Sequence, residues 1–307
     1  MFILPGTWEL ASLLAKLLLY IGAFSIAGGS LCAWRYSNAD RSALAANFLY
    51  VFFGTVAGFH GAILGFLVQV GLISNSGLAG MFDWGMISIL MDTSLGDVTL
   101  YRLIAFMIAG VVSLVCLKRL QDSSFNLSSP FCRLLFALQV VALAGLAYSL
   151  RIAGHVSVLG VVSQTAITLH FVAFALWIGS CFPFLQLTRI LDVETLQGSL
   201  RRFGRDAIGI LLVLVIAGVL MLFDLLGSVQ ELVNTAYGLA LLAKFLLVLV
   251  ILGIAAMNKL VLVPGLTGHA GIARLQTSLR YEIVVAMLIL LVTAYLATIV
   301  GPADHSM

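Results

Sequence analysis

The chain has 307 residues, of which 62% are hydrophobic and 9% charged, and its mean hydropathy is +1.15. A soluble globular domain carries roughly 25% charged residues, so this composition excludes a water-soluble fold for lack of polar surface. The net charge of +3 is too small to favour a nucleic acid as partner. We therefore expect a single membrane domain over residues 1–307.

Apolar runs of span length follow one another along the chain. A bilayer core of about 30 Å requires roughly 20 apolar residues in a helix. Eight such runs predict an all-α, polytopic membrane bundle, with spans near 10–33, 48–73, 101–117, 131–150, 160–183, 206–227, 237–257 and 281–300. An even number of spans places both termini on the same side. Between the second and third runs, the segment 74–100 predicts a short interfacial helix.

Basic residues predict the orientation, because Lys and Arg accumulate in cytoplasmic loops. If the N-terminus lies outside, the inner loops hold 12 of the 16 basic residues, namely Arg35, Arg41, Lys118, Arg119, Arg133, Arg189, Arg201, Arg202, Arg205, Lys259, Arg274 and Arg280. We therefore expect both termini on the non-cytoplasmic side. The basic inner loops suit the anionic headgroups of membrane lipids.

The second span carries four glycines on one stripe. Their spacings of 4, 3 and 4 residues allow a neighbouring helix backbone to approach closely, and the glycines are Gly54, Gly58, Gly61 and Gly65. His60 lies about 130° around the helix from this stripe, at about 100° per residue. The pattern predicts that the stripe packs against another helix and that His60 faces something else.

Two histidines lie near the middle of spans, where ionisable side chains are costly and often functional. They are His60 in the second span and His170 in the fifth. Imidazole binds copper, zinc and haem iron, so the two rings are candidates for one shared site, and the alternative is two buried, hydrogen-bonded histidines. One face of the fifth span is either a relay for a soft cation or a packing seam, and it carries His170, Phe174, Trp177 and Cys181.

Soft ligands are distributed unevenly between the two predicted sides. The four cysteines map to inner helix ends, where they are either small apolar residues or a thiolate-rich exit for Cu(I): Cys32, Cys116, Cys132 and Cys181. The outer side holds His155, Met107, Met221 and a tail with His305 and Met307, which are candidates for metal capture. Asp224 and Lys244 lie in the outer third of adjacent spans, and we expect each to pair with the other or with the outer vestibule.

No catalytic motif accompanies these residues. The sequence has no nucleophile elbow, phosphate-binding loop, zinc-protease helix or CxxC pair, so we expect no enzyme activity.

Several segments resemble the copper resistance protein D family (CopD/PcoD type) of bacterial inner membranes. The match is specific over 151–300, through Gly154-His155, LHFVAFALWIG, RRFGRDA with the later Gly218, TAYGLALLAKF, AAMNKLVLVP and LRYEIVVAML. These segments include His170, Trp177, Lys244, Asn258 and Glu282. Residues 1–150 fit more loosely, through Gln69 and the segment MDTSLGDVTLYR with Arg102. Lys259 stands where the family pattern leads us to expect arginine.

The resemblance implies an eight-helix protein of the bacterial inner membrane that handles copper with a periplasmic copper-binding partner of the CopC type. We expect copper, favoured as Cu(I), to enter near His155, Met107, Met221 and the tail. It would pass His170 with His60 and leave near the cysteines, a direction that favours uptake. One alternative is a haem-b electron-transfer protein with His60 and His170 as axial ligands. The other is a scaffold for a periplasmic copper chaperone.

Overall fold

The computed structural model describes residues 5–122, 126–225 and 231–300, and within these ranges it contains helices and no strand. Eight helical stretches are long and apolar enough to cross a membrane, which confirms the predicted all-α bundle. They are Thr7–Arg35, Arg41–Ser74, Ser94–Arg119, Pro130–Arg151, Val161–Leu187, Val193–Leu222, Ala236–Leu262 and Gly268–Val300.

Several of these stretches combine two or three helical segments. The first contains α1 (Thr7–Phe24), the π-helical η1 (Ser25–Gly29) and α2 (Ser30–Arg35). The fifth contains α7 (Val161–Gly179) and α8 (Cys181–Leu187). The last two are α11 (Ala236–Met257) with η4 (Asn258–Leu262), and α12 (Gly268–Tyr295) with η5 (Leu296–Val300).

The remaining long helices are continuous, and short helices connect some of them. The long ones are α3 (Arg41–Ser74), α5 (Ser94–Arg119), α6 (Pro130–Arg151) and α9 (Val193–Leu225). The short ones are η2 (Gly77–Phe82), α4 (Trp84–Met91), η3 (Gly154–Val158) and α10 (Glu231–Asn234). α4 confirms the short helix expected in 74–100, and none of its residues is buried.

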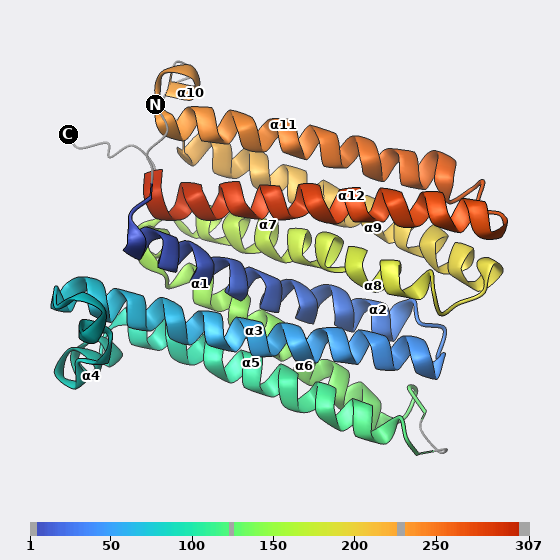
Figure 1. The fold of residues 1–307 in the computed structure, drawn as a ribbon, viewed down its shortest axis with the longest axis horizontal. Coiled ribbons are helices and arrows are strands. Elements are labelled where there is room, and N and C mark those ends of the chain that lie inside the picture. Colours follow the sequence, from blue (N-terminus) through green and yellow to red (C-terminus); the bar gives the residue numbers. More distant parts are fainter. Residues whose placement is uncertain (1–4, 123–125, 226–230, 301–307) are drawn as a thin grey trace.

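The helices form two groups on either side of α7 (Figure 1). α1 packs on α3, α3 on α5, and α5 on α6, while α7 packs on α9 and α11 packs on α12. α12 also contacts α1, which joins the two groups. α1 begins and η5 ends at one end of the bundle, here called the termini end, and the opposite end is called the basic end.

The glycine stripe of α3 packs against α1, as the sequence predicts. A Cβ atom on Gly58 would lie 3.0 Å from Cα of Gly22 on α1, besides colliding with the Phe106 ring of α5, and one on Gly61 would lie 2.7 Å from the backbone nitrogen of Leu19. The tightest crossing lies elsewhere, between η1 and the end of α7. There a Cβ atom on Gly28 would collide with the carbonyl group of Gly179, so the two backbones touch directly.

Candidate functional site

His170 lies on α7 and faces the neighbouring helix α9. Its ring nitrogen Nδ1 is 3.0 Å from the backbone carbonyl oxygen of Leu214. A Cβ atom at Gly218 would lie 3.2 Å from both Nδ1 and Cε1 of the ring, so the glycine leaves room for the imidazole. Leu214 and Gly218 therefore position the histidine, one by a hydrogen bond and the other by lacking a side chain.

This contact assigns a role to each ring nitrogen. A carbonyl oxygen can only accept a hydrogen bond, so Nδ1 of His170 carries the proton and donates it to Leu214. In the neutral ring, Nε2 then keeps its lone pair. Metal-binding histidines are commonly oriented in this way, with one nitrogen donating to a carbonyl group and the other bound to the metal. The geometry suits His170 to bind a soft or borderline cation.

Lys244 on α11 lies close enough to His170 to act on it electrostatically, and it is half-buried. On the same face of α11, Ile251 is buried, and Asn258 at the start of η4 is buried as well. This face therefore points into the bundle. The side chain of Asp224 lies outside the described residues, so its pairing with Lys244 stays a prediction.

His60 does not share a site with His170. Its side chain is exposed on α3, and Nδ1 contacts the backbone carbonyl oxygen of Val56 in the same helix at 2.7 Å. The expectation of one site for both histidines is wrong for a geometric reason. Both rings lie near midspan, but the glycine stripe packs α3 against α1 and leaves His60 on an outward face. Among the residues placed by the structure, no group of three or more His, Cys, Asp or Glu side chains forms a metal site.

The face of α7 that continues from His170 toward the basic end belongs to the apolar core. Trp177 and Cys181 are buried in the same cluster as Phe24 and Ile251, and Phe174 packs against that cluster. The Cys181 sulfur is 3.8 Å from the backbone carbonyl oxygen of Trp177. This face is therefore a packing seam between His170 and the basic end.

The candidate ligands expected on the outer side are dispersed. Met107 is exposed in the middle of α5, not at its outer end, and Met221 is half-buried on α9. The side chain of His155 and the tail residues His305 and Met307 lie outside the described residues. Their part in metal capture stays a prediction.

An open cleft of about 560 Å³ lies at the termini end, between α5, α6, η3 and α7. Asp97, Tyr101, Tyr148 and Arg151 contribute to its walls. Gln164 accepts a hydrogen bond from Arg151 at 3.1 Å and donates to the carbonyl oxygens of the 157–159 segment. The cleft is therefore polar and carries a carboxylate beside the η3 segment.

Two further cations near the termini end contact neutral oxygens. Arg102 donates from Nε to the hydroxyl oxygen of Ser149 at 3.2 Å. Lys16 donates to the backbone carbonyl oxygen of Ala297 at 2.6 Å, which ties α1 to η5. Arg102 thus has a hydroxyl partner.

A buried polar cluster lies toward the basic end. Asn258 donates from Nδ2 to the Glu282 carboxylate at 2.9 Å, and the Ser278 hydroxyl donates to Oδ1 of Asn258 at 2.5 Å. All three side chains are less than 10% exposed. The cluster joins η4 to α12 and satisfies polar groups that would be costly if left unpaired.

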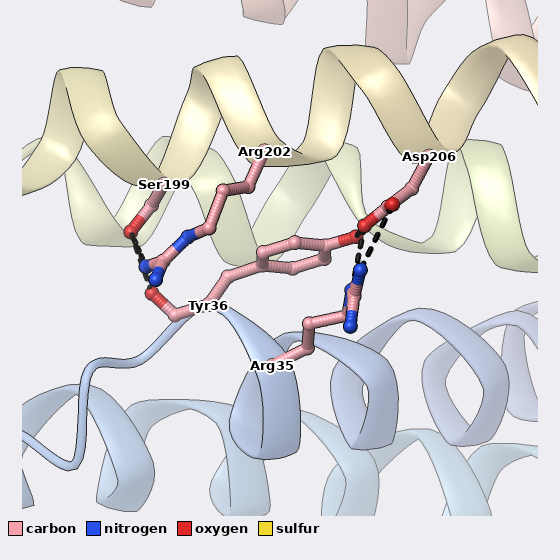
Figure 2. A network of polar contacts seen from close by, with 5 residues as sticks. All are labelled: Arg35, Tyr36, Ser199, Arg202 and Asp206. Atoms are coloured by element: carbon pink, nitrogen blue, oxygen red, sulfur yellow. Dashed lines mark hydrogen bonds and ion pairs between the residues drawn. The ribbon is translucent and has the colours of Figure 1, made fainter.

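A second polar network connects the end of α2 with α9 (Figure 2). Arg35 contacts both carboxylate oxygens of Asp206, at 2.6 and 3.0 Å, and the Tyr36 hydroxyl donates to the same carboxylate at 2.5 Å. Ser199 donates to the Tyr36 carbonyl oxygen at 2.9 Å, and Arg202 contacts Ser199. Burial, followed by the Asp206 carboxylate, raises the pKa of Tyr36, so the phenol stays a donor. The RRFGRDA segment shows in the sequence that this part of α9 is charged, but it does not show which residues the charged side chains contact.

Replacing Asp206 with alanine is expected to lower the free energy of unfolding by about 1–3 kcal/mol, because the buried Tyr36 hydroxyl loses its acceptor. Arg35→Gln should cost less, since the Arg35 side chain is 56% exposed and exposed ion pairs contribute little. Thermal unfolding of the detergent-purified variants measures both. Equal effects of the two substitutions would contradict this ranking.

These features define an all-helical, multi-pass membrane protein. Family models match two regions: Copper resistance protein D-like, N-terminal domain at residues 7–158, and Copper resistance protein D at residues 197–296. The copper resistance protein D of Pseudomonas syringae pv. tomato is 31% identical over 232 residues, which cover 68% of this chain and 69% of that protein. The chain belongs to the copper resistance protein D family, and its function is related to copper. No solved structure matches it.

Proposed function

We propose that this protein carries copper across the bacterial inner membrane, from the periplasm to the cytoplasm. Its family supports copper as cargo. The loops at the basic end hold most of the Lys and Arg residues, which supports a cytoplasmic basic end and periplasmic termini. Under this proposal the cargo is Cu(I), the copper ion that imidazole and thioether groups hold without a fixed anionic charge.

The observation that carries the proposal is the orientation of His170. Its Nδ1 is hydrogen-bonded to Leu214 at 3.0 Å, which leaves Nε2 as a ligand nitrogen near the middle of a span. An ionisable ring at that depth is costly, so its presence there points to a functional role. A single imidazole with few fixed partners binds a cation weakly enough for the ion to leave again, as a transport path requires.

The polar cleft at the termini end supports entry from the periplasm. Its Asp97 carboxylate and the η3 segment, which contains His155, lie beside each other. We propose that a periplasmic copper-binding protein of the CopC type delivers copper at this cleft. Toward the opposite end, the buried, free Cys116 and Cys132 support release there.

The two alternatives are less well supported. A haem held between His60 and His170 requires both rings to face one space, whereas His60 faces outward and bonds within its own helix. A scaffold without transport would also use the cleft, so transport itself must be measured.

Purified protein reconstituted in liposomes tests the proposal. With Cu(I) supplied outside, we expect copper to accumulate in the lumen faster than in liposomes without protein. Accumulation equal to that of empty liposomes would contradict transport, and copper binding without accumulation would favour the scaffold. An absorption spectrum of the same preparation with a Soret band would favour the haem-b alternative.

A further inference from the structure

A small, partly open cavity lies near the basic end, between α2, α3, α5 and α6. Its volume is about 20 Å³, enough for one water molecule or one small ion. Most of the lining is apolar and includes Trp34, Phe48 and Phe136. Four side chains in the lining bear polar or soft atoms, and they are Ser30, Cys116, Cys132 and Gln139.

The two cysteines approach this cavity from adjacent helices. Cys116 lies in the last turn of α5 and Cys132 in the first turn of α6. Both are free and buried, at 4% and 5% exposure, and both line the same cavity.

Two buried oxygens beside the cysteines have no hydrogen-bond partner among the described residues. They are the Ser30 hydroxyl, in a residue 7% exposed, and Oε1 of Gln139, in a residue 2% exposed. The Gln139 amide nitrogen is already engaged, at 3.2 Å from the Ala109 carbonyl oxygen and 3.2 Å from the Ser113 hydroxyl. An unsatisfied buried polar group costs about 1–3 kcal/mol, so an occupant that engages these atoms would be stabilised.

We propose that Cys116 and Cys132 bind one Cu(I) ion in this cavity. Thiolate is the ligand class that selects Cu(I), and two thiolates from facing helices match an ion that needs few ligands. Binding replaces the two thiol protons by the metal and releases both protons, which leaves one net negative charge on the site. The Ser30 hydroxyl donates to a thiolate, and the α6 N-terminus offsets the remaining charge.

The proposal of this site depends on the proposed function only because that function identifies the ion as copper. The site lies between α2, α3, α5 and α6, close to the basic end, whereas His170 lies on α7. Under the proposed orientation it is a cytoplasmic holding site, reached after His170. Cys32 and Cys181 are also buried but do not line the cavity, so they provide matched controls.

The full-length protein is titrated with Cu(I) under reducing conditions against a chromophoric Cu(I) chelator, and the bound copper is characterised by X-ray absorption. We expect one copper with sulfur neighbours in the unsubstituted protein. Cys116→Ser and Cys132→Ser should each weaken its binding by about tenfold or more, since even indirect supports of a metal ligand contribute 10–100-fold to affinity. Cys32→Ser should leave this copper in place.

Copper without sulfur neighbours, or copper retained by both serine variants, would overturn the site and indicate a cavity that holds water. The spectrum of the unsubstituted protein gives this answer even if a variant fails to fold. The same preparations are assayed in liposomes to separate the two proposals. Sulfur-bound copper without transport overturns the proposed function alone, and transport by protein that binds no Cu(I) through sulfur overturns the inner site alone.

Discussion

Replacing His170 with alanine is expected to abolish copper accumulation in reconstituted liposomes while the protein still inserts in the membrane. The substitution removes the only midspan imidazole that faces a neighbouring helix within the described residues. Losing a direct metal ligand should weaken copper binding at that point by at least about tenfold, because supporting residues alone contribute 10–100-fold. Copper in the lumen, measured with time, should fall to the level of liposomes without protein.

His60→Ala is the matched control, because His60 has the same side chain at a similar depth but faces outward. We expect this variant to transport copper as the unsubstituted protein does. Unchanged accumulation in His170→Ala would rule out a path through this ring. Equal losses in both variants would restore the idea of a site shared by the two histidines.

Replacing Gly28 with valine is expected to prevent accumulation of folded protein. Any Cβ atom on Gly28 collides with the backbone of Gly179, and a Cβ atom on Gly179 collides with the carbonyl oxygen of Phe24. Overpacking a well-packed contact costs about 1–3 kcal/mol, and more where rigid backbone must move. Since proteins have only about 5–15 kcal/mol of stability, the variant should yield little monodisperse protein on size exclusion.

Gly253 on α11 is the control, because a Cβ atom there has no atom within 4 Å. Gly253→Ala should accumulate normally, since alanine favours helix over glycine by about 1 kcal/mol. A Gly28→Val variant with normal yield and melting temperature would show that η1 and α7 can separate without loss of stability.

The eight spans are predictable from the sequence because lipid demands about 20 apolar residues in each helix. Their ends are harder to locate. α9 begins at Val193 although its apolar run starts near 206, and α12 begins at Gly268 although its run starts near 281. In both cases polar, basic turns continue the helix beyond the apolar stretch, so hydropathy marks the membrane part of a helix and not its whole length.

The candidate site is only partly predictable from the sequence, because the sequence gives the depth of a residue but not the direction of its side chain. Depth along a span follows from residue number, and it identifies His170 and His60 equally. The direction in which each ring points depends on which face packs against a neighbour, and this separates the two. Leu214 contributes only its backbone carbonyl oxygen, which no side-chain pattern can reveal. The contacts of Asp206 with Arg35 and Tyr36 span about 170 positions and need the fold.

The contact between Gly28 and Gly179 gives the first span and α7 a common pivot. No side chains lie between the two backbones there, so a rocking motion of one helix on the other would turn about this point. Tyr36 lies about 12 Å along the helix from Gly28, at about 1.5 Å per residue. A tilt of about 10° would move it by roughly 2 Å, enough to break its hydrogen bond to Asp206. The same tilt would move the two helices toward each other on the His170 side of the pivot.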